Sequence, residues 1–265
     1  MLEDYNIKVI YEDNHLLCVV KPPGTLSQGD RSNSSDMLSL LKAYIKGKYN
    51  KPGDVFLGLV HRLDRPVGGA MVFGRTSKAA ARLSEQIRER AFVKIYYAVL
   101  KGEMPEDSGA LSNIIVKDGG ANKVSVLPIN GKHGGTVATL EYERAEVKEG
   151  LTLVRVNLIT GRPHQIRAQF AYHGYPVLGD RKYKGLAKGR TTGRHELAAD
   201  WYDQAASQHE WAADRRIKVE NPALWAKKIE FSHPITKERM IVEAELPICY
   251  PWRLFTEAVS RASLV

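Results

Sequence analysis

Residues 59–69 read Leu-Val-His-Arg-Leu-Asp-Arg-Pro-Val-Gly-Gly, a polar cluster between an apolar lead-in and paired glycines. The apolar residues 70–73 follow and predict a short buried strand. This order is typical of a loop that presents side chains and lets its backbone pass close to a neighbour. Asp64 stands between Arg62 and Arg65, and such cations favour the ionised form of a carboxylate, which can act as an acceptor or a nucleophile. A surface loop with local ion pairs explains the same spacing.

Working outward from this loop, the chain alternates strand and helix patterns. Strands are predicted at residues 8–11, 15–21, 92–100, 136–142, 151–159, 229–231 and 240–245. Helices are predicted at 37–46 with Ser35 or Asp36 as the cap, at 77–90 with Ser77 as the cap, and at 162–173 with Thr160 as the cap. A polar connection is expected between strands 136–142 and 151–159. The pattern predicts an α+β fold with a central, largely antiparallel mixed sheet flanked by helices and loops.

Composition narrows the class of protein. The chain has 265 residues, with 39 Lys and Arg against 30 Asp and Glu, so its formal net charge is +9. A hydrophobic fraction of 43% excludes wholesale disorder, and the excess of cations favours a polyanionic partner. No nucleotide-cradling glycine motif and no metal-ligand spacing occurs, so we expect neither a cofactor nor a metal.

The cysteines and the apolar runs bear on location. Cys18 and Cys249 are the two cysteines and form no disulfide or zinc pattern, and the start of the chain has no apolar segment of the secretory kind. No apolar run reaches the roughly 18 residues that a spanning helix needs. We therefore expect a cytoplasmic protein without a membrane partner.

Two further stretches are candidates for chemistry. Residues 160–169 read Thr-Gly-Arg-Pro-His-Gln-Ile-Arg-Ala-Gln, in which Arg162 and Arg167 lie at a predicted helix start and predict an anion site. A capped amphipathic helix with solvated arginines is the alternative. Residues 94–98 read Lys-Ile-Tyr-Tyr-Ala, and strand alternation sets Tyr96 on the opposite face to Tyr97.

Taken together, these stretches resemble the RluA-type family of RNA pseudouridine synthases. The resemblance is colinear and covers most of the chain. Residues 9–17 and 20–24 are similar to the opening motif of the family, and His61-Arg-Leu-Asp64 is similar to its central signature. Residues 94–98, followed by Gly102, are similar to its middle strand. The last motif is similar to residues 160–167, followed by Gly174, Pro176, Gly179 and Asp180.

The resemblance implies the pseudouridine synthase fold and the isomerisation of uridine to pseudouridine in RNA, without cofactor or metal. It implies Asp64 as the catalytic carboxylate, Tyr96 against the target base, and Arg167 as the ion-pair partner of Asp64. The target nucleotide would flip into the site, Arg62 would fill the space that it leaves, and Ile166 would contact the base. His61, Arg162 and His164, from the matched motifs, are the further substrate-contact candidates. The partner would be structured RNA, either tRNA or rRNA.

The chain departs from the family pattern at several points. Residues 65–69 replace the family's usual Thr-Ser-Gly ending, residues 224–226 read Leu-Trp-Ala for Leu-His-Ala, and residues 189–221 form a longer connection that we interpret as an insertion. We expect a single catalytic domain over 1–265, acting as a monomer without the small N-terminal RNA-binding domain of many members. RNA contact then rests on the catalytic domain, with these candidates in the basic stretch 180–190: Arg181, Lys182 and Lys184.

Two other functions stay open. The loss of two hydroxyls after Asp64 is compatible with a non-catalytic RNA-binding protein or RNA chaperone on the same fold. A carboxylate between cations is also compatible with a hydrolase that uses an aspartate nucleophile, although no second catalytic carboxylate stands at a recognisable position.

Overall fold

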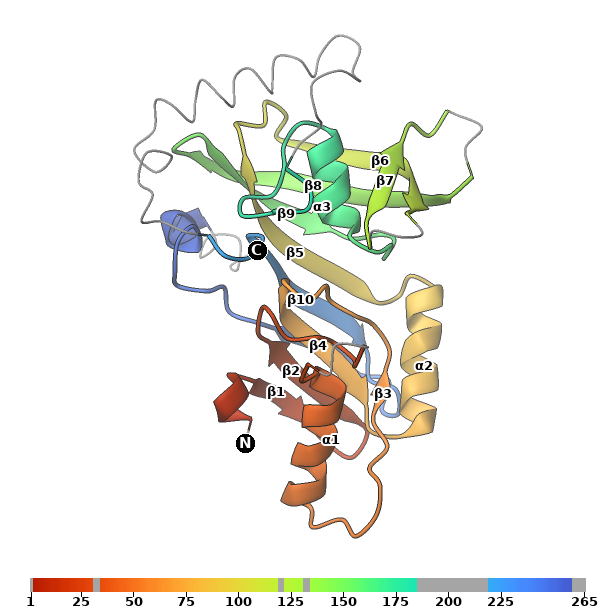
Figure 1. The fold of residues 1–265 in the computed structure, drawn as a ribbon. Coiled ribbons are helices and arrows are strands. Elements are labelled where there is room, and N and C mark those ends of the chain that lie inside the picture. The colour runs from red at the N-terminus through yellow and green to blue at the C-terminus, as the bar shows by residue number, and fades with distance from the viewer. Residues whose placement is uncertain (1, 31–33, 119–121, 131–133, 185–218, 259–265) are drawn as a thin grey trace. The chain divides into compact units, whose positions relative to one another are not determined.

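The structure is a computed structural model and describes residues 2–30, 34–118, 122–130, 134–184 and 219–258 (Figure 1). The chain divides into two compact units, each made of two segments. Unit 1 comprises Met1–Ile95 and Trp225–Leu246, and unit 2 comprises Tyr96–Leu224 and Pro247–Val265. The expected single domain over 1–265 stays a prediction. Apart from its last three residues, the predicted insertion at 189–221 lies outside the described residues.

Unit 1 is built on a mixed sheet. Its strands are β1 (Lys8–Glu12), β2 (Leu16–Lys21), β3 (Gly58–Leu59), β4 (Gly68–Gly74), β10 (Leu224–Ser232) and β11 (Arg239–Glu243). The order is β1-β2-β4-β10, with β3 paired to β4 and β11 paired to β10. The pair β4–β10 is parallel and the other pairs are antiparallel. All seven residues of β4 are buried, which explains why this strand reads as a continuous apolar run.

Two helices complete unit 1, after the short 3-10 turn η1 (Glu3–Tyr5). Helix α1 (Met37–Lys48) is capped by Asp36, whose carboxylate accepts from the backbone N of Ser39. Helix α2 (Ser77–Arg88) packs against β4. The prediction that Ser77 caps α2 is wrong, because Thr76 has the extended backbone of a cap and its Oγ1 accepts from Ala79 N at 3.2 Å.

Unit 2 holds a second run of strands. They are β5 (Val93–Lys101), which the chain enters from unit 1, β6 (Ser108–Lys117), β7 (Val124–Leu127), β8 (Thr136–Lys148) and β9 (Leu151–Asn157). Their order is β5-β9-β8-β6-β7, and the pairs β6–β7, β6–β8 and β8–β9 are antiparallel. Helix α3 (Gln165–Tyr172) packs against β6 and β7 (Figure 1), and the 3-10 turn η2 (Trp252–Phe255) contacts β8.

The expected polar connection after residue 142 is wrong. Strand β8 continues to Lys148, and the chain turns at Glu149 and Gly150, which both have positive φ, straight into β9. The polar residues of this stretch belong to the outer part of a paired strand, not to a loop. With that change, the structure confirms the predicted α+β fold and its largely antiparallel mixed strands.

Candidate active site

The loop at residues 60–67 joins β3 to β4 and carries Asp64 in unit 1. Inside the loop, the backbone N of Val67 donates to the carbonyl of Asp64 at 3.0 Å and closes a turn. The buried hydroxyl of Ser27 donates to the carbonyl of Leu63 at 2.7 Å and accepts from its backbone N at 3.1 Å. The residue before Asp64 is therefore held on both backbone groups, while Asp64 itself stays half-buried.

Lys21 holds the same loop from the end of β2. Its side chain is fully buried, and its Nζ donates to the carbonyls of Pro22 (3.0 Å), Arg65 (3.1 Å) and Val67 (2.8 Å). Burial lowers the pKa of Lys21 to about 7, while Asp64 raises it and Arg65 lowers it further. A buried amine at the end of β2 thus holds Arg65 and Val67, the first and third residues after Asp64.

Sequence reasoning did not select Lys21 or Ser27 as site residues. A signal was available for Lys21, since it lies in the stretch 20–24 that resembles the family's opening motif. No pattern marked Ser27, because its partner Leu63 lies 36 residues away in the chain.

His61 supports the loop instead of titrating. Its Nε2 accepts a hydrogen bond from the backbone N of Val72 in β4 at 3.0 Å, which leaves the proton of the neutral ring on Nδ1. Its ring lies 5.6 Å from that of Phe92, which stacks in turn on Phe231. Burial, with a smaller contribution from Lys94, lowers the pKa of His61 to about 3. The imidazole is therefore neutral at physiological pH.

Arg167 and Asp180 form a buried ion pair in unit 2. Arg167 Nε donates to Asp180 Oδ2 at 2.6 Å and its Nη2 donates to Oδ1 at 3.0 Å. The two side chains are 4% and 0% exposed. Asp180 Oδ1 also accepts from the backbone N of Lys182 and of Tyr183. The guanidinium is therefore held in one orientation by Asp180, which stands in the last matched motif but had no predicted role.

The predicted catalytic residue Tyr96 and the predicted base contact Ile166 lie in secondary-structure elements. Tyr96 and Ile166 are buried, in β5 and in the first turn of α3. Asp64 belongs to unit 1, whereas Tyr96 and Arg167 belong to unit 2. The pairing of Asp64 with Arg167 and the assigned catalytic roles stay predictions.

The start of α3 differs from the expected capped helix. The helix begins at Gln165, and its N-cap is His164 in a left-handed conformation (φ 54°) instead of Thr160. Thr160 Oγ1 donates to the side chain of Gln165 at 2.8 Å, and the same Gln165 oxygen accepts from the backbone N of Arg162. The side-chain amide therefore folds the segment back before the helix starts. Arg167, one of the two arginines of the predicted anion site, forms an ion pair with Asp180, and the anion site itself stays a prediction.

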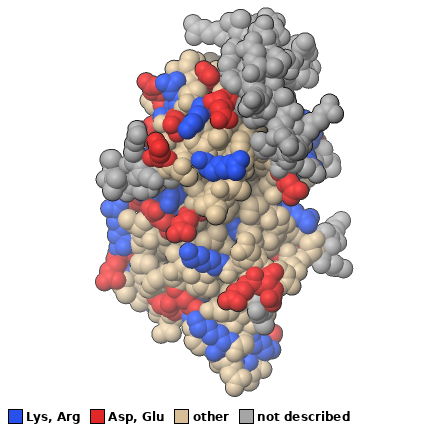
Figure 2. Space-filling view, turned by 90° about the vertical axis from the view of Figure 1, so that its left-hand side faces the viewer, with Lys and Arg blue, Asp and Glu red and all other residues tan. Residues whose placement is uncertain are grey.

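The predicted RNA contacts lie mostly at the surface. Arg62, Arg162, Arg181 and Lys184 are exposed, and Arg162 Nε donates to the carbonyl of Val137 at 3.3 Å. Lys182 is half-buried, and its Nζ donates to the carbonyl of Asn122 at 2.8 Å. Figure 2 shows Lys and Arg side chains interspersed with Asp and Glu on the face that it presents, so charges of both signs occupy that face.

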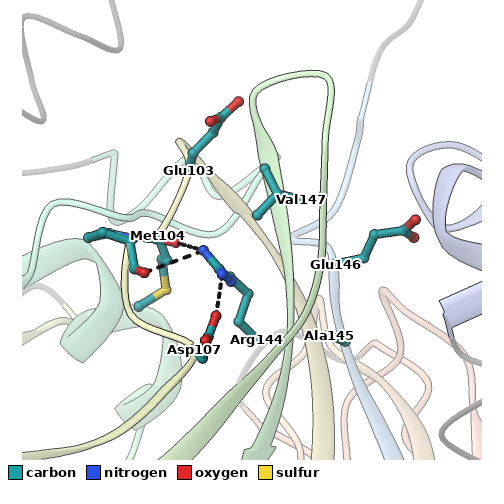
Figure 3. A pocket seen from close by; sticks show the side chains of 8 residues that line it. Glu103, Met104, Asp107, Arg144, Ala145, Glu146 and Val147 are labelled. Carbon is teal, nitrogen blue, oxygen red and sulfur yellow. Dashed lines mark hydrogen bonds and ion pairs between the residues drawn. The ribbon is translucent and has the colours of Figure 1, made fainter.

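A cavity of about 560 Å³ lies in unit 2 beside β8 (Figure 3). Arg144 in its wall donates to the carbonyl of Met104 at 2.6 Å and pairs with the carboxylate of Asp107. Glu103 and Glu146 also line it. None of the predicted site residues borders this cavity, so it is separate from the candidate active site.

The part of the chain that the structure describes holds neither a cluster of metal ligands nor a membrane-spanning helix. Within residues 2–30, 34–118, 122–130, 134–184 and 219–258, no three His, Cys, Asp or Glu side chains come together as metal ligands. Within the same ranges, no helix combines the length and the apolar character needed to cross a membrane.

Comparison with known proteins identifies the family. Residues 15–172 match the family described as RNA pseudouridylate synthase. The chain is 29% identical over 255 residues to ribosomal large subunit pseudouridine synthase D of Pseudomonas aeruginosa, covering 96% of this chain and 72% of the relative. It is 30% identical over 238 residues to ribosomal large subunit pseudouridine synthase C of Vibrio vulnificus, covering 90% and 65%.

Solved structures agree on the fold. Human RNA pseudouridylate synthase domain containing 4 superimposes with a TM-score of 0.69 at 22% identity, over 97% of this chain and 93% of that one. The chain therefore belongs to the RNA pseudouridylate synthase family, in its RluA-type branch. Members of this class are isomerases that convert uridine to pseudouridine in RNA.

Proposed function

We propose that this enzyme isomerises specific uridines in structured RNA, with Asp64 as the nucleophile or base and with the target nucleotide flipped out of its stack. The observation that carries the proposal is the Asp64 loop. Ser27 fixes the residue before Asp64 and Lys21 fixes residues after it, while Asp64 as a whole residue stays only half-buried. A rigid backbone with an accessible reactive group is what preorganised chemistry requires.

The chemistry balances without a cofactor. The N1–C1′ bond of the uridine breaks, the uracil turns, a C5–C1′ bond forms, and the proton at C5 leaves while N1 gains one. An ionised Asp64 can begin by adding to C6, by attacking C1′ or by removing a sugar proton. We assign Tyr96 to the face of the base and the departure of the C5 proton, Ile166 to an apolar contact with the base, and Arg167 to the charge balance of the catalytic set.

Binding follows from the exposed cations. We assign Arg62 to the space that the flipped nucleotide leaves, where a guanidinium can stack between bases. Arg162, Arg181, Lys182 and Lys184 would contact phosphates, which gives salt-dependent affinity with little sequence preference. We assign His164 to the same surface, and His61 to the support of the loop that meets the RNA.

The RNA is either rRNA or tRNA. The names of the two bacterial relatives refer to the large ribosomal subunit, so large-subunit rRNA is the first substrate to test and tRNA is the second. We further propose that the enzyme works as a monomer in the cytoplasm. Free thiols at Cys18 and Cys249 suit a reducing compartment, and sedimentation at micromolar concentration tests the monomer.

The test is tritium release from RNA that carries 5-tritiated uridine. Wild-type protein should release tritium from total rRNA or tRNA, and Asp64→Asn should release none. Asp54→Asn serves as the matched control, because Asp54 is an exposed carboxylate of the same unit, and it should match wild type. If wild type equals Asp64→Asn on both RNA pools, the proposal fails, and RNA binding without turnover would then favour an RNA chaperone.

A further inference from the structure

Tyr183 lies three residues after Asp180, between helix α3 and the hairpin β6–β7. Its side chain packs against a small apolar cluster with members in β6, β7, β8 and α3: Ile115, Val124, Ala138 and Ala168. The residue is half-buried, so its ring is enclosed by this cluster on part of its surface.

The ring and the backbone of Tyr183 both act on the Arg167–Asp180 pair. The guanidinium carbon of Arg167 lies 5.4 Å from the centre of the Tyr183 ring, within the range of a cation–π contact. The backbone N of Tyr183 donates to Asp180 Oδ1 at 3.1 Å, on the oxygen that also accepts from Arg167. The planar guanidinium is thus bounded by a carboxylate at its edge and by an aromatic ring.

The hydroxyl of Tyr183 fixes the position of that ring. It accepts from the backbone N of Val124 at 2.9 Å, which ties it to the first residue of β7. It also lies 2.8 Å from His164 Nδ1. Val124 N can only donate, so all three atoms are satisfied when the tyrosine proton points to Nδ1 and the neutral His164 keeps its proton on Nε2. His164 itself has the left-handed backbone of the α3 N-cap, a conformation that such tertiary bonds must hold.

We propose that Tyr183 is a positioning residue, which fixes the guanidinium of Arg167 and connects its orientation to hairpin β6–β7. The proposal rests on the proposed function, because Arg167 matters to turnover only if it belongs to the catalytic set. Tyr183 acts through Arg167 and needs no contact with the RNA. A change at Tyr183 should therefore lower kcat with little effect on KM.

Two variants distinguish the contribution of the Tyr183 hydroxyl from that of its aromatic ring. Tyr183→Phe removes the hydroxyl and keeps the ring beside Arg167, and we expect kcat in the tritium-release assay to fall about fivefold. Tyr183→Leu also removes the ring, and we expect a further fall of about fivefold. KM should stay within about twofold for both variants. Tyr44→Phe is the matched control, because it removes a hydroxyl bonded to Glu12 in unit 1 and should leave kcat unchanged.

A double-mutant cycle with Arg167→Lys tests the route of the effect under single-turnover conditions. If Tyr183 acts through Arg167, adding Tyr183→Phe to Arg167→Lys should change the rate less than twofold. Thermal melts of every variant separate loss of positioning from loss of fold, and Tyr183→Phe should melt within a few degrees of wild type.

The outcomes are distinguishable from failure of the function itself. If wild type turns over RNA and Asp64→Asn does not, but Tyr183→Phe and Tyr183→Leu both match wild type, the positioning role is overturned. Equal rate losses from Tyr183→Phe in the wild-type and Arg167→Lys backgrounds overturn it as well. An inactive wild type contradicts the proposed function, and the positioning role falls with it.

Discussion

Replacing Lys21 with Met tests whether the buried amine positions the Asp64 loop. Met keeps the unbranched stem and most of the volume of Lys, so the core around β2 stays filled. The change removes the donors to the carbonyls of Pro22, Arg65 and Val67. The carbonyl of Arg65 keeps a second partner, the backbone N of Gly24 at 2.8 Å, whereas the bond to Val67 is the shortest of the three and is lost.

The magnitude follows from these contacts. A hydrogen bond from a charged donor contributes about 1.5–3 kcal/mol. Loss of the bond to Val67, with weakening at Arg65, should therefore lower the free energy that stabilises the loop conformation by about 2 kcal/mol. That corresponds to a fall of about 30-fold in kcat if the whole displacement is felt at Asp64. The free energy of unfolding should change much less, because removing the amine also removes the several kcal/mol that its desolvation costs.

The pH dependence gives a second signature. Because burial lowers the pKa of Lys21 to about 7, the amine loses a proton as pH rises through 7 and keeps two N–H donors for three carbonyls. Wild-type kcat should therefore fall on the alkaline side of pH 7. Stability should move the other way: the unfolded chain binds the proton up to a pKa of about 10.4, so the contribution of this group to stability rises between pH 7 and 10. Both trends should disappear in Lys21→Met.

The assay is kcat for tritium release from pH 6 to 9, with denaturant unfolding at each pH. Lys78→Met is the control, because Lys78 is exposed in the first turn of α2 and its loss should change neither quantity. A Lys21→Met enzyme within threefold of wild-type kcat would refute the positioning argument. So would a fall in stability that accounts for the whole loss of activity.

Three further predictions concern the Arg167–Asp180 ion pair, the backbone at Gly69 and the protonation of His61. Asp180→Asn removes the buried carboxylate that pairs with Arg167 and should cost about 3–5 kcal/mol in denaturant unfolding, whereas Asp107→Asn removes an exposed ion pair and should cost less than about 1 kcal/mol. Gly69→Ala would set a Cβ at positive φ and 2.3 Å from the backbone of β10, so we expect little soluble protein. Gly24→Ala also has positive φ but meets no atom within 4 Å, and should cost only about 1 kcal/mol. The pKa of His61 is about 3 in the folded protein and near 6.5 in the unfolded chain. The free energy of unfolding should therefore fall as pH drops below 6.5, because the unfolded chain then binds a proton that the folded protein does not. His61→Gln keeps an acceptor for the backbone N of Val72 and should show a shallower fall.

Local patterns predicted much of the fold. Strands β2 and β4 are apolar runs with turn residues at their ends, and α1 and α2 have helical spacing of their apolar residues, so each carries its own signal. Strand β6 was not predicted, because its apolar run is limited to Ile114, Ile115 and Val116. It contains Ser, Gly and Asn, residues with low strand propensity, and its extended form depends on pairing along β8. Strand β3 has two residues and β7 has four, too few for any periodicity.

The cap of α2 shows that a sequence pattern locates a helix start only to within about one residue. Thr76 and Ser77 are both good capping residues, and a one-residue choice between them depends on which backbone is extended. At the start of α3, the N-cap is His164, and the hydroxyl of Thr160 donates to the side chain of Gln165 instead of capping the helix.

The sequence by itself determined the family and the candidate reactive residues. Asp64 with its flanking cations, Tyr96 and Arg167 are read from short motifs, and motifs are local. Only the tertiary structure decided what holds those residues. Lys21 reaches carbonyls 44 and 46 residues away, and Arg167 is oriented by Asp180. The physical reason is that a buried donor must find its acceptors wherever packing brings them, and that choice is made by the folded chain as a whole.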